Sequence, residues 1–185
     1  GSRSAGEWIA RYIRHALRHE SQPVLDYVLI THFHSDHMGE PSPTTPDSAS
    51  GTYKLSGVTR VGETFRIGKL LDRGWPDYAY PAPLTDKATT NYRAFVKWQA
   101  EHNGLKVERF APGRNDQVVL RRNPGKFPDF EFRNIGANGE VWTGVGTETR
   151  RHFPALDTVP RADWPHENMC STSFRLSYGR FDFFN

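Results

Sequence analysis

Apolar and polar positions near the start of the chain alternate with the period of an α-helix. Within residues 2–20, the arginines lie mostly opposite one apolar face. Ser4 is followed three positions later by Glu7, which is the spacing of a capping box and predicts where the helix starts. The predicted buried face consists of Trp8, Ile9, Tyr12, Ile13, Ala16 and Leu17. We expect this helix to pack on a sheet.

A second helical pattern occupies residues 88–104. Thr90 or Asn91 is its predicted N-cap, and Gly104 is predicted to end it. The side chains predicted to line one face are Tyr92, Phe95, Val96 and Gln99.

Short apolar runs predict the strands. Residues 24–30, VLDYVLI, are apolar and rich in β-branched residues, which is typical of a central strand buried on both faces. Residues 39–51 are rich in Pro, Ser, Thr and Gly and predict a loop. Residues 53–83 contain two or three short β-like pieces and a helical turn.

From Leu105 the pattern changes to alternating runs between turn signals, which predicts a β-meander. Residues 147–168 are polar and predicted to be irregular, and residues 172–185 predict two strands joined near Tyr178 and Gly179. The predicted meander runs are 105–110, 117–121, 129–136 and 140–144.

Composition limits the classes that the chain can belong to. With 185 residues, 36% hydrophobic residues and many aromatic ones, it is predicted to fold as one globular domain. A formal charge of +3 is too small for a dedicated nucleic-acid binder and is compatible with an anionic substrate. Cys170 is the one cysteine, which excludes a disulfide framework and a multi-cysteine zinc site. No apolar run is long enough for a membrane span, and the compartment stays open.

The stretch THFHSDHMGE carries the candidate chemistry. His32, His34, Asp36 and His37 are four of the six residues 32–37, which follow the predicted strand. Alternate residues of a strand point the same way, so His32 and His34 are expected to hold one metal ion. The backbone is expected to turn after them, so that Asp36 and His37 hold a second.

Imidazole and carboxylate ligands suit zinc first, with manganese or iron as alternatives. Two divalent metal ions would acidify a water molecule and give hydroxide at neutral pH, and Asp36 would orient the attacking water. A cluster of surface or structural histidines without metal is the competing interpretation.

The sequence resembles the metallo-β-lactamase superfamily at these residues. HFHSDH, preceded by DYVLIT, matches the HxHxDH signature. The end of the chain is similar to the NxxS…L.YG.F segment of the ComEC competence family and its free-standing relatives, at Asn168, Ser171, Leu176, Tyr178, Gly179 and Phe181.

The resemblance implies an α+β fold, an αββα sandwich with a dinuclear site between two sheets. It also implies that an aspartate from a GD motif and another histidine lie beyond Asn185, and that strands of the same domain precede Gly1. Residues 1–185 are then expected to be a single incomplete domain, with a long insertion at about 40–167.

Other candidate residues come from the middle and the end of the chain. Arg73 lies among aromatic residues and is a candidate for substrate binding. The favoured alternative is a rigid loop in which Arg73 forms a surface ion pair with Asp72 and Trp75 lies in the core. Asn168 is a second candidate, with a turn role as its alternative. Further possible metal ligands are His102, expected to be exposed, and His152 and His166. Cys170 is expected to be a buried thiol.

Two function classes follow from the sequence. The first is a metal-dependent hydrolase that uses metal-bound hydroxide on a phosphodiester, as in a nuclease; an ester, lactone or thioester is an alternative substrate because the ligands do not fix the leaving group. The expected partner is an anionic small molecule or a nucleic acid. The second class is a non-catalytic binding module that keeps the fold and uses the insertion as its contact surface.

Overall fold

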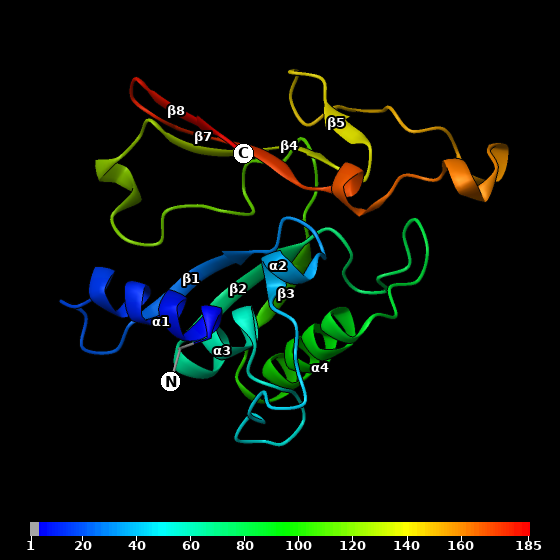
Figure 1. Cartoon of the computed structure of the whole chain (residues 1–185). Coiled ribbons are helices and arrows are strands. Elements are labelled where there is room, and N and C mark those ends of the chain that lie inside the picture. Colours follow the sequence, from blue (N-terminus) through cyan, green and yellow to red (C-terminus); the bar gives the residue numbers. More distant parts are fainter. Residues whose placement is uncertain (1–3) are drawn as a thin grey trace. The chain divides into compact units, whose positions relative to one another are not determined.

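The computed structural model describes residues 4–185 and divides the chain into two compact units, each built around one sheet (Figure 1). The first unit runs to Leu71 and includes Leu84–Glu108. The second comprises Asp72–Pro83 and Arg109–Asn185. One sheet contains a parallel pair and the other is antiparallel, which agrees with the predicted α+β class.

The first unit has a three-stranded sheet in the order β1-β2-β3, together with four helices. β1 and β2 are parallel, in register from Val24 opposite Arg66 to Leu29 opposite Leu71. The elements are α1 (Ala5–Ala16), β1 (Val24–Leu29), α2 (Ser35–Met38), α3 (Gly57–Thr64), β2 (Arg66–Asp72), α4 (Lys87–His102) and β3 (Lys106–Arg109).

Helix α1 starts as predicted but buries a different face. Ser4 and Glu7 form the capping box. The helix packs on α3 through Gly6 and Ala10, because small residues let two helix backbones approach closely. The prediction of an apolar buried face is wrong, because none of its six residues is buried. Ile13 and Leu17 are half-buried, and the exposed ones are Trp8 (55%), Ile9 (47%), Tyr12 (74%) and Ala16.

Strand β1 exists where it was predicted, but it is not a central strand. It lies at one end of the strand order, and its burial is partial and alternating at first. The segment between β1 and α4 also differs from the prediction, since an eight-residue helix, α3, and a seven-residue strand, β2, replace the expected short β pieces.

Helix α4 confirms the predicted buried face, because Tyr92, Phe95, Val96 and Gln99 are all buried. Its N-cap is Asp86, whose carboxylate accepts a hydrogen bond from the Thr89 amide at 2.9 Å, and not Thr90 or Asn91. The helix therefore starts earlier than predicted.

The second unit is a five-stranded antiparallel sheet in the order β6-β5-β4-β7-β8. Asn138 and Gly139 join β4 to β5 with φ of 52° and 75°, the two left-handed residues of a type I′ turn. The strands are β4 (Phe130–Ala137), β5 (Glu140–Trp142), β6 (Thr149–Arg151), β7 (Ser173–Tyr178) and β8 (Phe181–Phe184).

The predicted meander is confirmed only in part. Strands β4 and β5 form an antiparallel pair as expected, and β7 and β8 are joined at the predicted turn. Residues 117–121 form no strand, residues 106–109 belong to the other sheet, and β6 lies in a segment predicted to be irregular. Across residues 4–185, no helix is both long enough and apolar enough to cross a bilayer.

Candidate metal centre

The predicted ligands follow the end of β1. The strand ends at Leu29, and the Ile30 amide then donates to the Leu71 carbonyl at 2.9 Å. His34 is the N-cap of α2, and its carbonyl accepts from the amides of His37 (3.0 Å) and Met38 (3.2 Å). The backbone thus turns after His34, as the sequence predicted.

The three imidazoles of the motif lie close together. The ring centroid of His32 is 5.0 Å from that of His34 and 3.9 Å from that of His37. The Nε2 atom of His37 is 3.7 Å from a carboxylate oxygen of Asp36. The rings of His34 and His37 thus each lie close to that of His32, and the Asp36 carboxylate lies beside His37.

Thr31 lies beside two of these rings and was not singled out from the sequence. Its hydroxyl oxygen is 3.3 Å from Nδ1 of His32 and 3.5 Å from Nδ1 of His37. A histidine that binds metal through Nε2 is commonly oriented by a hydrogen bond at Nδ1. Thr31 is placed to orient both rings, and its only sequence signal is its position next to His32.

Burial differs among the ligands. His32 is buried, whereas His34, Asp36 and His37 are exposed. The set of imidazoles and one carboxylate fits zinc, iron or manganese. Within residues 4–185, however, no three His, Cys, Asp or Glu side chains are arranged as a group that could hold a metal ion. The types of side chain in the motif therefore suit these metals, but in the described part of the chain they are not already arranged as a three-ligand site.

The short helix α2 is held against α3 by a close backbone contact. Gly57 has a φ of +46°, and a Cβ atom added to it would lie 2.0 Å from the Met38 carbonyl oxygen. Met38 is fully buried at this contact. Only a glycine fits between the two helices here, and the contact fixes the turn that carries Asp36 and His37.

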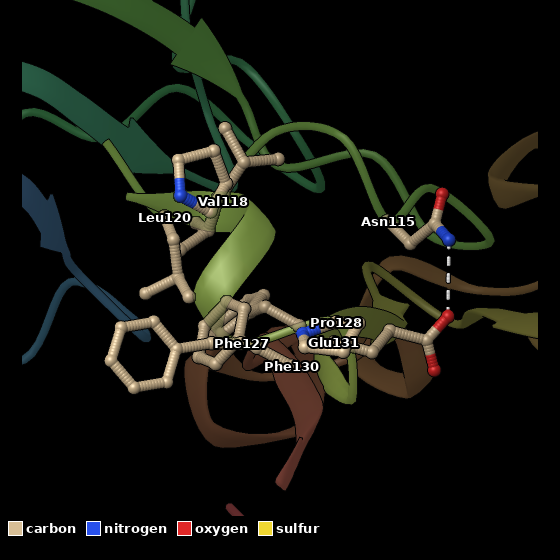
Figure 2. A pocket seen from close by; sticks show the side chains of 10 residues that line it. Asn115, Val118, Leu120, Phe127, Pro128, Phe130 and Glu131 are labelled. Atoms are coloured by element: carbon tan, nitrogen blue, oxygen red, sulfur yellow. Dashed lines mark hydrogen bonds between the residues drawn. The ribbon is translucent and has the colours of Figure 1, made fainter. Parts of the chain in front are cut away.

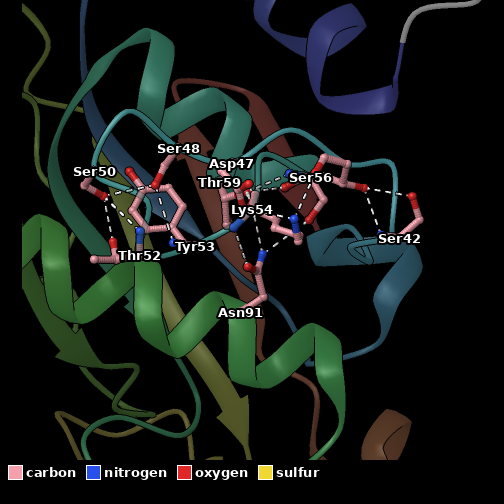
Figure 3. A network of polar contacts seen from close by, with 11 residues as sticks. Ser42, Asp47, Ser48, Ser50, Thr52, Tyr53, Lys54, Ser56, Thr59 and Asn91 are labelled. Carbon is pink, nitrogen blue, oxygen red and sulfur yellow. Dashed lines mark hydrogen bonds and ion pairs between the residues drawn. The ribbon is translucent and has the colours of Figure 1, made fainter.

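The loop that follows the motif is tied to the helices. Figure 3 shows a network of polar contacts in which the Asn91 side chain on α4 accepts from the Lys54 amide (2.7 Å) and donates to the Lys54 carbonyl (3.0 Å). The Lys54 ammonium pairs with Asp47 at 2.9 Å, and the Thr59 hydroxyl donates to the Lys54 carbonyl. Asn91, predicted as a helix cap, instead anchors this loop.

Arg73 is fully buried in the second unit. Its Nε and Nη2 donate to the two carboxylate oxygens of Glu167, and Nη1 donates at 3.0 Å to both the Tyr80 carbonyl and the Asn138 side chain. The predicted substrate contact finds no support in this arrangement, because the guanidinium is enclosed by its own unit.

The alternative prediction for this loop, a surface pair of Asp72 and Arg73, is wrong because both side chains are fully buried. The Asp72 carboxylate accepts from the amides of Gly74 and Trp75 and from the Tyr78 hydroxyl, at 2.7–3.0 Å. Trp75, predicted to be in the core, is half-buried, and Tyr78 is buried instead.

The other candidates lie apart from the motif in sequence and differ in exposure. His102 is exposed, as expected, and stacks on Trp98 with ring centroids 4.8 Å apart. His152, His166 and Asn168 are exposed residues of the second unit. Cys170 is fully buried as predicted, and burial raises the pKa of its thiol to about 11.

An apolar cavity of about 280 Å³ lies beside β4 in the second unit (Figure 2). Leu120, Phe127 and Phe130 contribute apolar walls, and the Asn115 side chain donates to Glu131 at 3.0 Å on its rim. Three groups, those of Asn115, Arg133 and Arg175, hydrogen-bond to the Glu131 carboxylate. Burial alone would raise its pKa, but these contacts leave the pKa lowered. The carboxylate is thus a structural acceptor.

Comparison with the models of known protein families and with curated proteins finds no match to this chain. The two-unit α+β architecture and the gathered histidines are therefore the basis for the functional assignment.

Proposed function

We propose that this chain carries the metal centre of a metal-dependent hydrolase of the metallo-β-lactamase type, and that the substrate is a phosphodiester. One observation carries the proposal: three imidazoles from a single short segment lie close together after the end of a parallel strand, with the ring centroids of His37 and His34 3.9 and 5.0 Å from that of His32. In α/β sheets, this end of a strand is where functional sites commonly lie.

The protein residues have separable roles in this proposal. Bound divalent metal ions supply Lewis acidity, which activates water and stabilises charge on phosphoryl oxygens. His32, His34, Asp36 and His37 would hold them. Thr31 would orient His32 and His37 through their Nδ1 atoms, which leaves the Nε2 atoms for coordination.

The architecture agrees with the proposal only at the level of the α+β class. One unit combines a parallel pair of strands with α-helices, and the described part of the other combines an antiparallel sheet with short 3-10 helices. The exposure of His34, Asp36 and His37 leaves these side chains accessible to metal and substrate.

Metal binding and turnover test the proposal directly. The chain, alone and within any longer polypeptide that contains it, is loaded with zinc or manganese, and bound metal is measured by elemental analysis. Hydrolysis of bis-p-nitrophenyl phosphate is measured on the same samples. We expect His34→Ala to lose bound metal and activity together. His102→Ala, which removes an exposed imidazole from α4, is the matched control and should retain both.

The outcomes separate the function classes. Loss of metal in His34→Ala but not in His102→Ala supports the metal centre. Equal metal binding in both variants contradicts it. Full metal occupancy without turnover of phosphodiesters, esters or lactones contradicts the hydrolase and favours the binding module.

A further inference from the structure

Strand β8 forms one edge of the sheet in the second unit (Figure 1). It pairs with β7 on one side, and no strand among residues 4–185 pairs with its other side. The opposite edge of the same sheet is β6, which carries two exposed arginines, Arg150 and Arg151. Charged side chains of this kind commonly protect a sheet edge from pairing with another chain. Three of the four residues of β8 are phenylalanines, so the two edges differ in this protection.

The one charged residue of β8 is held by its own sheet, because the Asp182 carboxylate accepts a hydrogen bond from the Ser177 hydroxyl on β7. The side chains of Phe181, Phe183 and Phe184 are all exposed. An edge strand that combines open backbone groups with exposed apolar side chains is a template for a further strand. The partner that fits this edge is therefore a β-strand with apolar residues at alternate positions.

A row of aromatic rings crosses the same sheet and ends at this edge. The ring centroid of Phe174 on β7 is 4.4 Å from that of Phe132 on β4 and 5.9 Å from that of Phe183 on β8. Alternation along the strand places Phe181 on the same face as Phe183. Strand β8 thus has both an open edge and apolar residues at alternate positions. A second copy of β8 meets both requirements of the partner.

We propose that two copies of this chain associate through β8, antiparallel about a two-fold axis, so that their two sheets become one continuous sheet. The backbone hydrogen bonds decide which residues meet. The Asn185 amide donates to the Phe174 carbonyl at 3.2 Å, so residues 181, 183 and 185 direct their backbone groups toward β7. The N–H and C=O groups of Asp182 and Phe184 therefore point to the open edge.

Two-fold symmetry limits the registers of such a pair, because residues opposite one another lie on the same face of the sheet. With Phe183 opposite its own counterpart, Asp182 of each copy is opposite Phe184 of the other, and these residues exchange backbone hydrogen bonds. The two Phe183 rings then meet in a close pair without backbone hydrogen bonds, which joins the two aromatic rows. A register with Asp182 opposite its counterpart is disfavoured, because it places like charges side by side.

This inference does not rest on the proposed metal centre, because β8 belongs to the second unit and the histidine motif to the first. Two short strands make a small interface, whereas stable specific complexes usually bury about 1,200–2,000 Å². We therefore expect a reversible dimer whose population rises with protein concentration.

Sedimentation velocity of the full chain tests the association. Between about 1 μM and 1 mM of chain, the average mass should rise from that of one chain toward that of two, and not beyond. Phe183→Lys should raise the dissociation constant by at least about tenfold, because two ammonium groups then lie opposite each other. Phe184→Lys is the matched control: it adds the same charge to the other face, opposite Asp182 of the second copy, and should leave the dimer at least as stable. Circular dichroism confirms that each variant is folded.

Single cysteines test the register separately from the affinity. Phe183→Cys places two thiols directly opposite each other, with Cα atoms about 4.5 Å apart, a separation that a disulfide can span. We expect oxidised glutathione to convert this variant to a covalent dimer on a non-reducing gel, whereas Asp182→Cys stays a single chain. The natural Cys170 is fully buried and does not compete with the added thiols.

Three outcomes would overturn the proposal. One is the mass of a single chain over the whole concentration range. Another is a mass that keeps rising beyond two chains, which would indicate unspecific association of edges. The third is equal weakening by Phe183→Lys and Phe184→Lys, or faster cross-linking of Asp182→Cys than of Phe183→Cys, either of which would contradict the register.

Discussion

The buried ion pair between Arg73 and Glu167 allows a direct test of how much a buried charge pair contributes to the stability of the second unit. The two residues are 94 positions apart in sequence, and their side chains are 0% and 12% exposed. The Glu167→Gln substitution keeps the shape of the side chain and removes the countercharge. Removing one partner of a buried pair typically costs about 3–5 kcal/mol, because the remaining charge stays buried without compensation.

The same unit contains a matched surface pair. Arg114 donates from Nε and Nη2 to the two carboxylate oxygens of Asp116, at 2.7 and 2.8 Å, so both pairs are bidentate. The side chains of this second pair are 46% and 63% exposed. Asp116→Asn should therefore cost less than about 1 kcal/mol, as is usual for exposed pairs. The comparison varies burial while the contact geometry stays the same.

Chemical denaturation followed by tryptophan fluorescence and circular dichroism measures both costs. For a chain of this length, a loss of 3–5 kcal/mol corresponds to a fall in Tm of about 6–20 °C. We expect Arg73→Met to relieve part of the cost of Glu167→Gln in the double variant, because no unpaired charge then remains. A cost for Glu167→Gln below about 1 kcal/mol, or equal to that of Asp116→Asn, would refute the reasoning.

Three further predictions follow from single contacts. Thr31→Val should weaken metal binding by about 10- to 100-fold while His32 stays in place, as measured by competition with a zinc chelator; unchanged affinity would exclude the orienting role of Thr31. Gly57→Ala should destabilise the protein by at least about 1–2 kcal/mol, because its φ of +46° is unfavourable for alanine and the added carbon meets the Met38 carbonyl; a stability within error of the parent in urea denaturation would contradict this. The thiol of Cys170, with its pKa raised by burial from 9.0 to about 11, should react with Ellman's reagent at pH 8 only after unfolding. Rapid reaction of the native protein with this reagent would contradict the burial of the thiol. Because the thiol ionises at lower pH in the unfolded chain than in the folded one, the free energy of unfolding should also fall as the pH rises from about 9 to 11.

Features that depend on neighbouring residues were predictable from the sequence alone. The capping box of Ser4 and Glu7 and the turn near Tyr178 and Gly179 depend on contacts within a few residues. The face of α4 that is buried was also predicted, because its apolar residues recur with the helical period. The ligand cluster belongs to this group too. An extended chain would separate His32 and His37 by about 17 Å, so their gathering depends on the turn at α2, which the sequence predicted. The orienting hydroxyl of Thr31 was not predicted.

Features that depend on distant partners were decided only by the tertiary structure. Helix α1 buries Gly6 and Ala10 and leaves Trp8 and Tyr12 exposed, because the fit to α3 selects small residues and not the most apolar face. Arg73 was predicted as a surface or substrate-binding residue, and it is enclosed because Glu167, 94 residues later, supplies the countercharge that makes burial tolerable. Hydrophobic periodicity records the tendency of each segment to be buried, but which face packs, and which charge is paired, depends on residues that only the folded chain brings together.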